Sequence, residues 1–242
     1  MSLLPTYIHP TWKDLLTDEF LLLLNDIETY LDLLPCKSCG YAYFPKKQNV
    51  MRFLSMDINE IKCVILGMEP YPSYYQKGSN FLPIATGRSF EIANVISWNQ
   101  KFKQSSLRNI LKAVYFNEIG KKKSLEEVRK EIIEGNFYIS QPNKWFENLE
   151  KEGVLFLNAT LTVEPEKPDT HSKIWEKTMN KIIAYINSHT RPKWLLFGNK
   201  AEERLIKAIG TQSNMYKCSH PRLASFVDEN IFKNVPEIKW NA

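Results

Sequence analysis

Three residues with chemically active side chains follow apolar segments that lie far apart in the sequence. Glu69 comes three residues after the run Cys63–Leu66, Asn158 directly follows Val154–Leu157, and His220 follows a fourth run. A carboxylate, an amide and an imidazole around one pocket can support several reactions, so the residue types predict an enzyme site without identifying its reaction. Each residue also has an ordinary structural alternative: a loop carboxylate, a cap of a helix or turn, and a hydrogen-bonded structural histidine.

The apolar runs have the length of β-strands, and the first three are apolar at every position, as expected for parallel strands covered on both faces. The four runs are Cys63–Leu66, Val154–Leu157, Trp194–Phe197 and Met215–Cys218. Helix-like stretches alternate with them: Ser106–Phe116, Leu125–Glu134, Trp175–Ser188 and Ala201–Ile209. The alternation predicts an α/β fold, a three-layer α/β/α sandwich with a short, mainly parallel central sheet. Ligands bind at the carboxyl ends of such strands, so we expect Glu69, Asn158 and His220 to converge.

Length and composition predict one domain over residues 1–242. The 242 residues are 43% hydrophobic and 24% charged, which is enough to bury one sizeable core. No repeat, low-complexity tract or Gly/Ser linker marks a second domain. Residues 1–43 are expected to form a helical segment packed on this domain, with an amphipathic helix from about Thr11 to Leu34 that Pro35 ends.

The sequence favours a cytoplasmic monomer with no membrane association. The longest aliphatic run, Phe20–Leu24, is far shorter than the roughly 20 residues of a membrane span, and Met1–Pro10 lacks the features of a signal peptide. Four scattered cysteines suit a reducing compartment. Cys36 and Cys39 have ligand-like spacing but no second pair, so we expect incidental thiols, with a metal or redox site as the alternative.

The formal net charge of +5 is unevenly placed. Residues 61–120 hold 7 Lys/Arg against 3 Asp/Glu, and residues 191–242 hold 9 against 5. A basic surface of this kind suits a polyanion such as nucleic acid, and a solvated basic face without a partner is the alternative on charge alone.

The amino-acid sequences of the loops are more specific than the spacing of the candidate residues. Gly67-Met68-Glu69-Pro70-Tyr71 resembles the water-activating loop of family 1 uracil-DNA glycosylases, whose pattern is Gly-Gln-Asp-Pro-Tyr-His. Other segments resemble that family's remaining blocks in the same order: Gly87–Phe90, Ser106–Asn109, Val154–Val163, His171 with Trp175-Glu176, Trp194–Gly198, His220-Pro221 and Ile238–Trp240. The resemblance runs from about Phe44 to Trp240, and the joint order of the blocks is its strongest feature.

The resemblance implies an enzyme that flips a uracil nucleotide out of the duplex before acting on it, at an unstacking cost of a few kcal/mol. Phe90 would stack on the base, and the Asn158 amide would pair with its Watson–Crick edge. Cytosine would leave buried donors unpaired at a cost of about 1–3 kcal/mol each, and Tyr71 would exclude thymine by crowding its C5 position.

The resemblance also implies the catalytic roles. Glu69 would orient the attacking water and stabilise the cationic sugar. His220 and the backbone N–H of Met68 would stabilise the negative charge on the departing uracil. No metal or organic cofactor is implied. Uracil-containing DNA is the expected partner, and a protein inhibitor or repair partner is not identified.

Contacts to DNA are implied at four further positions. Ser106 corresponds to a phosphate-contacting serine at the start of a helix, and His171 lies in the block before the next long helix. Leu223 is the candidate wedge that enters the duplex, and Arg222 supplies a charged phosphate contact. The alternative for this pair is that Leu223 packs inside and Arg222 is solvated.

Three departures from the family pattern affect activity rather than fold. Glu69 replaces aspartate, and its extra methylene shifts the carboxylate by about an ångström, which can cost roughly a hundredfold in rate. Met68 replaces glutamine, and Pro72 replaces histidine and so removes a donor. The last block is one residue shorter than the family's His-Pro-Ser-Pro-Leu-Ser.

The segment Ala93–Gln104 is longer than its counterpart in the family. Its aromatic and basic residues Trp98, Lys101, Phe102 and Lys103 suit either single-stranded DNA or a surface loop with packed aromatics, and we expect the second.

Three hypotheses for the function follow. The first is a hydrolase that removes uracil from DNA and so initiates base-excision repair. The second is a catalytically weakened DNA- or protein-binding module on the same scaffold. The third, an unrelated nucleotide-binding α/β protein, is disfavoured because no strand is followed by a GxGxxG motif or a P-loop.

Overall fold

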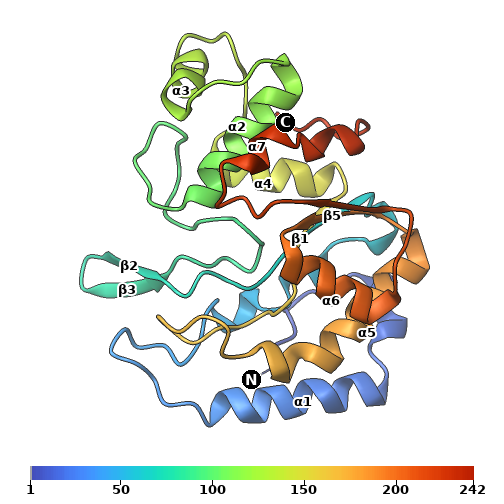
Figure 1. The fold of residues 1–242 in the computed structure, drawn as a ribbon. Coiled ribbons are helices and arrows are strands. Elements are labelled where there is room, and N and C mark those ends of the chain that lie inside the picture. The colour runs from blue at the N-terminus through green and yellow to red at the C-terminus, as the bar shows by residue number, and fades with distance from the viewer. Residues whose placement is uncertain (1) are drawn as a thin grey trace.

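A four-stranded parallel sheet forms the centre of the computed structural model, which describes residues 2–242 (Figure 1). Its strands are β1 (Cys63–Gly67), β4 (Val154–Asn158), β5 (Lys193–Phe197) and β6 (Met215–Cys218), in the order β4-β1-β5-β6. All four predicted strands are confirmed to within one residue at either end. The prediction of an α/β sandwich around a parallel sheet is also confirmed.

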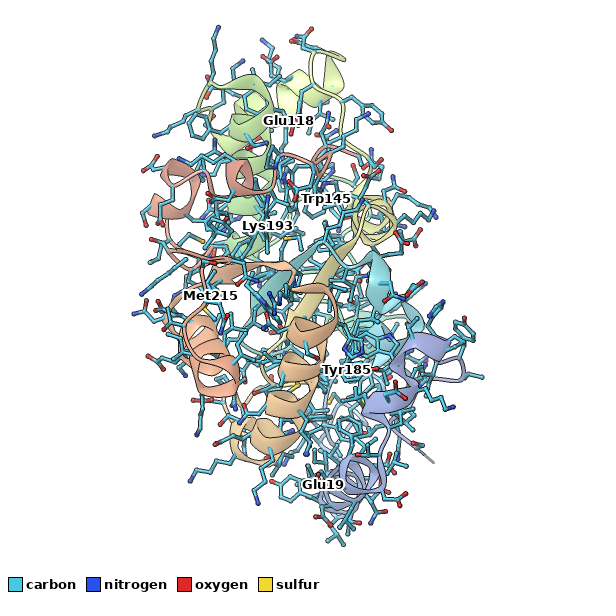
Figure 2. The ribbon with its side chains drawn as sticks, turned by 90° about the vertical axis from the view of Figure 1, so that its right-hand side faces the viewer. Glu19, Glu118, Trp145, Tyr185, Lys193 and Met215 are labelled. Carbon is cyan, nitrogen blue, oxygen red and sulfur yellow. The ribbon has the colours of Figure 1, made fainter. Side chains whose placement is uncertain are left out.

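Helices cover both faces of the sheet, which explains why its strands are apolar at every position. On one face lie α2 (Ser105–Ile119), α3 (Leu125–Ile133), α4 (Pro142–Lys151) and the short α7 (Ser225–Asp228); on the other lie α1 (Asp18–Asp32), α5 (Ser172–Thr190) and α6 (Asn199–Ile209) (Figure 1). Alternate strand residues enter opposite cores: Ile65 packs with the α2–α4 layer and Val64 with the α5–α6 layer. Figure 2 shows Trp145 of α4 and Tyr185 of α5 in these two layers.

The amino-terminal helix differs from the prediction. The expected helix from Thr11 to Leu34 is two elements, the 3₁₀ helix η1 (Pro10–Leu15) and α1. Thr17 separates them, because its side chain accepts a hydrogen bond from the Phe20 N–H at 3.3 Å and so caps the start of α1. α1 then packs its apolar side against α5, as expected for a helical segment lying on the rest of the fold. That residues 1–242 form one domain stays a prediction.

Short elements complete the fold. An antiparallel hairpin, β2 (Tyr74–Lys77) and β3 (Asn80–Pro83), stands apart from the sheet, and the remaining 3₁₀ helices are η2 (Lys47–Asn49), η3 (Arg52–Ser55), η4 (Ile58–Glu60) and η5 (Ile231–Asn234). The sequence patterns did not predict the hairpin or α4. Between residues 2 and 242, no helix combines the length and apolarity that a membrane crossing requires.

The strand order places a ligand-binding crevice at a defined edge of the sheet. The chain crosses from β1 to β4 on one side and then returns past β1 to β5 on the other, so the connections diverge beside β1. In open α/β sheets, ligands bind outside the carboxyl ends of the strands at such a point. The segments after β1 and β6 and the last residue of β4 therefore meet at one edge.

Candidate active site

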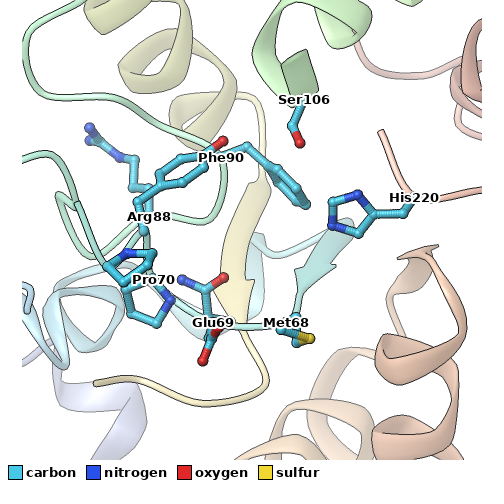
Figure 3. Close-up of a pocket in the computed structure, with 10 residues that line it drawn as sticks. Met68, Glu69, Pro70, Arg88, Phe90, Ser106 and His220 are labelled. Carbon is cyan, nitrogen blue, oxygen red and sulfur yellow. The ribbon is translucent and has the colours of Figure 1, made fainter. Parts of the chain in front are cut away.

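A pocket of about 150 Å³ lies at this edge of the sheet (Figure 3). Seven of the ten predicted site residues line it: Met68, Glu69, Tyr71, Phe90, Ser106, Asn158 and His220, together with Pro70, Pro72 and Arg88. Ligand sites for drug-sized molecules usually enclose about 300–1,000 Å³, so this pocket suits a single-ring group rather than a whole nucleotide. The structure thus brings together residues that are separated by up to about 150 positions in the sequence.

The floor of the pocket depends on the close approach of β1 and β4. Gly67 and Asn158 are partners in the parallel register, and Asn158 is only 2% exposed. A methyl group on Gly67 would lie 2.7 Å from the Asn158 Oδ1 and 3.2 Å from the Phe90 ring. Asn158 lines the pocket, and no hydrogen bond of its side chain is found among residues 2–242, so its amide is available to a ligand.

Phe90 lies on the pocket wall with a backbone conformation that is unusual for a bulky residue. Its φ is 66°, in the left-handed region, which costs of order 1–3 kcal/mol unless the surroundings hold it. Its ring centroid lies 5.3 Å from that of Phe197 and 6.2 Å from that of His220. These contacts leave the ring positioned to cover a planar group in the pocket.

A buried ion network next to Phe90 restrains its backbone. The Arg88 guanidinium donates to both oxygens of Glu150 at 2.7 and 2.5 Å, and to both oxygens of Glu91 at 2.9 and 3.1 Å. Arg88 and Glu91 are 8% and 6% exposed. Burial alone would lower the pKa of Arg88, but the two carboxylates raise it, so the guanidinium stays charged. The residues on either side of Ser89 and Phe90 are thereby tied to α4.

Glu69 is held by a loop that precedes α5. Its Oε2 accepts the Asp169 N–H at 2.8 Å, and the Asp169 carboxylate pairs with Lys200 at 3.0 Å. Burial raises the pKa of Glu69, and the hydrogen bond from Asp169 opposes that rise. The carboxylate is therefore partly desolvated and fixed on one oxygen, as a group that orients water must be.

The hydrogen bonds of His220 indicate its tautomer. Its Nδ1 accepts the Arg222 N–H at 3.1 Å, so in the neutral ring the proton is on Nε2. Burial and the Arg222 charge both lower the pKa of His220, which keeps the ring neutral at pH 7. Gly198, with φ of 97°, gives it room, since a Cβ there would lie 3.1 Å from that of His220. His220 can therefore donate through Nε2 without being charged.

Tyr71 and Ser106 close another side of the pocket. The Tyr71 hydroxyl is buried without a hydrogen-bond partner of acceptable geometry, and burial raises its pKa. Ser106 lies next to it at the start of α2 and is 7% exposed. Tyr71 thus presents a neutral, rigid ring to the pocket.

Arg222 and Leu223 flank the pocket rather than line it. The loop that carries them is fixed to α2, because the Asn109 amide donates to the carbonyls of Pro221 at 2.6 Å and Leu223 at 3.1 Å. Leu223 is 49% exposed, which contradicts the alternative that it packs inside. A half-exposed leucine beside the pocket is what a wedge would require.

His171 does not lie on a surface that could contact DNA, so this prediction is corrected. The residue is 0% exposed, its Nδ1 lies 2.8 Å from Thr162 Oγ1, and its ring packs edge-on against Tyr30. Trp175 donates to the same hydroxyl at 2.6 Å. His171 therefore belongs to a buried network that anchors the start of α5.

Two other sequence expectations can be compared with the structure. In the loop 93–104, Trp98 is 0% exposed and donates to the Ser140 carbonyl at 2.7 Å, so it packs as expected and cannot stack on DNA. Cys36 is exposed and Cys39 is buried, and the described part of the chain contains no cluster of three His, Cys, Asp or Glu side chains suited to a metal.

Sequence patterns missed three residues that position the site. Arg88, Asn109 and Asp169 act through groups distant in sequence: Arg88 through Glu150, Asn109 through Pro221 and Asp169 through Glu69. Gly87–Phe90 and Ser106–Asn109 did mark the right segments. Only the folded chain shows which partners these side chains reach.

Comparisons with known proteins agree with one another. The family model of the uracil DNA glycosylase superfamily matches residues 55–240. The chain is 32% identical to a uracil-DNA glycosylase of Buchnera aphidicola over 74% of this chain and 68% of that protein, and 28% identical to one of Francisella tularensis subsp. novicida over 96% and 98%. Its fold is similar to wild-type UNG of Nitratifractor salsuginis, with a TM-score of 0.69 at 22% identity, covering 95% of this chain and 91% of that one. Mimivirus uracil-DNA glycosylase gives a TM-score of 0.63 at 18% identity over 88% and 69%.

Gly67→Ala should destabilise the protein by about 1–3 kcal/mol, because the added methyl overpacks the floor of the pocket. Urea unfolding measures this cost. The control is to make Gly67→Ala also in a protein that carries Asn158→Ala, which lacks the nearest clashing atom. In that protein, Gly67→Ala should lower the free energy of unfolding by less. Equal costs in the two backgrounds would contradict the proposed close approach.

Arg88→Met should destabilise by about 3–5 kcal/mol, since it leaves the buried Glu91 and the partly buried Glu150 carboxylates unpaired. The triple variant Arg88→Met/Glu91→Gln/Glu150→Gln removes those charges together and should recover much of the loss in the same urea experiment. No recovery in the triple variant would mean that the cost of Arg88→Met does not come from unpaired charge.

Proposed function

The chain belongs to the uracil-DNA glycosylase superfamily, and we propose that its pocket excises uracil flipped out of DNA by hydrolysing the N-glycosidic bond, which leaves an abasic site. The observation that supports this best is the meeting of Glu69, Phe90, Asn158 and His220 in one small pocket. A stacking ring, an amide, a neutral imidazole and a fixed carboxylate are the four groups that recognition and hydrolysis of a pyrimidine nucleoside require.

Recognition precedes chemistry. Phe90 stacks on the flipped base, and the unpaired Asn158 amide forms hydrogen bonds with the Watson–Crick edge of that base. The amino group of cytosine would face the donor N–H of the Asn158 amide in a buried site, and each unpaired group would cost about 1–3 kcal/mol of binding free energy. The Tyr71 ring crowds the C5 position and so disfavours thymine.

In the chemical step, the bond between the sugar carbon C1′ and the base nitrogen N1 breaks, and its electron pair stays on uracil. The His220 Nε2–H and the Met68 N–H stabilise the resulting negative charge, and a preorganised donor of this kind contributes roughly 3–4 kcal/mol in comparable sites. Glu69 orients the water whose oxygen bonds to C1′, and its charge stabilises the cationic sugar. The departing uracil anion then takes up one proton, which balances the proton lost by water.

We propose that the DNA backbone lies across the mouth of the pocket. Ser106 contacts a phosphate, Leu223 enters the space that the flipped nucleotide leaves, and Arg222 contacts the neighbouring backbone. The protein acts as a cytoplasmic monomer in base-excision repair, a location that its free cysteines support. Two mimivirus UNG variants have structures in complex with UGI.

Release of free uracil from an oligonucleotide with one deoxyuridine is the direct test. Wild-type protein should release uracil and not thymine or cytosine from matched strands, and Glu69→Gln should lower kcat by at least about a hundredfold because the water loses its orienting charge. DNA affinity should be unchanged. If folded wild-type protein bound the DNA and released no uracil at high concentration, the binding-module hypothesis would replace the enzyme.

The activity should fall as the pH is lowered, because the reaction needs ionised Glu69 and neutral His220. Burial raises the pKa of Glu69 above its ordinary value of 4.5, so the fall in activity on the acid side (the acid limb) should lie above that pH. Burial and Arg222 lower the pKa of His220 below 6.5, so this ring stays neutral to lower pH than an ordinary histidine. Arg222→Gln removes a charge that lowers the pKa of His220, so the limb should move to higher pH. A kcat/KM profile measures both, and an unchanged limb in Arg222→Gln would exclude His220 as the group titrating there.

A further inference from the structure

A basic stripe covers the outside of α2 and the loop that precedes it. Residues 92–117 contain four basic residues, Lys101, Lys103, Arg108 and Lys112, and no Asp or Glu. None of the four is in an ion pair within the described residues. Most other lysines of the fold are paired, including Lys122, Lys123, Lys130 and Lys144.

The stripe continues into the loop that flanks the pocket. The Asn109 amide donates to the carbonyls of Pro221 and Leu223, so exposed Arg222 lies beside α2. Ser106, which lines the pocket, is two residues from Arg108 on the same helix. Figure 3 shows Ser106 and His220 together on one side of the pocket, opposite Arg88. A strand leaving the pocket past Ser106 would reach α2, whose outer face carries Arg108 and Lys112.

The loop that carries Lys101 and Lys103 is rigidly supported. The Arg129 guanidinium donates to the carbonyls of Trp98 and Gln100 at 2.8 Å each, and it lies 5.7 Å from the Phe102 ring centre. A shallow cavity between this loop and α3 is lined by Lys101, Phe102 and Arg108, among others. The buried residues thus hold the loop, and the charges project outward.

Like charges gathered without partners are unfavourable unless an anion offsets them. Burial and then the Arg108 charge lower the pKa of Lys112, and the Asp228 carboxylate opposes that fall. The nearby acids are already engaged: Glu126 with Arg129 at 2.9 Å, and Asp228 with Lys122 at 2.7 Å. The surface is therefore complementary to a polyanion.

We propose that Lys101, Lys103, Arg108, Lys112 and Arg222 form a second contact area for DNA, which binds several phosphates of the strand that carries the uracil. The proposal rests on the proposed function, because that function supplies the polyanion and places it at Ser106. The stripe contributes affinity and not chemistry, since none of Lys101, Lys103 and Lys112 lines the pocket.

The test compares Lys101→Gln/Lys103→Gln/Lys112→Gln with a control triple, Lys13→Gln/Lys62→Gln/Lys151→Gln. The control removes the same charge from exposed, unpaired lysines, and Lys62 and Lys151 lie near the amino ends of β1 and β4, away from the pocket. Circular dichroism and thermal unfolding establish that both triples fold.

On a single-stranded oligonucleotide of about 20 nucleotides with a central deoxyuridine, the stripe variant should raise KM about tenfold at low salt with kcat unchanged. Its slope of log affinity against log salt should flatten by about 0.7 for each phosphate that the variant no longer neutralises. On a trinucleotide with the same deoxyuridine, it should match wild type, because the flanking phosphates are missing. A stripe variant with the KM and salt slope of the control triple would overturn the proposal.

The two proposals fail separately. Fluorescence anisotropy measures binding of the same 20-nucleotide strand without any turnover. If wild-type protein releases no uracil but the stripe variant alone loses affinity, the enzyme proposal fails and the contact area stands. If uracil is released and the stripe variant binds like the control, only the contact area fails.

Discussion

The close approach between Gly67 and the Asn158 amide is the constraint on which the pocket depends. Parallel pairing places the last residues of β1 and β4 side by side, and only a residue without a side chain leaves space there for the amide. The same absent Cβ lets the Phe90 ring reach the floor of the pocket. One glycine thus sets the separation between the group that pairs with a base and the ring that stacks on it.

The strain at Phe90 is offset outside the pocket. A left-handed φ at a phenylalanine persists only where neighbouring interactions over-determine it. Here Arg88 and Glu91 on either side are joined in one buried network with Glu150, and the Ser89 hydroxyl donates to the Ile65 carbonyl at 3.2 Å. Buried ion pairs contribute little net stability compared with apolar packing, but they tolerate few alternative geometries. The network therefore serves the position of the ring more than the free energy of unfolding.

The sequence predicted the strands, the parallel sheet, the uracil-DNA glycosylase family and the residues that meet in the pocket. These predictions succeeded because they depend on local features: apolar runs, and short loops directly after them. His171 was misassigned because its burial depends on Thr162 and Tyr30, which no pattern around His171 reveals. Arg88 and Asn109 were missed for the same reason, since their partners lie 62 and 112 residues away. Contacts of that range are properties of the fold rather than of a motif.

The carboxylate of Glu69 is held by the backbone of the loop that precedes α5. The longer Glu69 side chain reaches the Asp169 N–H, which a conformation with φ of 63° at Asp169 presents to it. A second contact, from the Glu166 N–H to the Pro72 carbonyl at 2.8 Å, joins the same two loops where histidine would otherwise supply a side-chain donor. The extra methylene and the missing donor are thus matched by backbone hydrogen bonds from one segment. The hydrogen bond from the Asp169 N–H fixes the Glu69 carboxylate in a partly buried position. The extra methylene therefore shifts this carboxylate, but the carboxylate remains ordered and can still orient water.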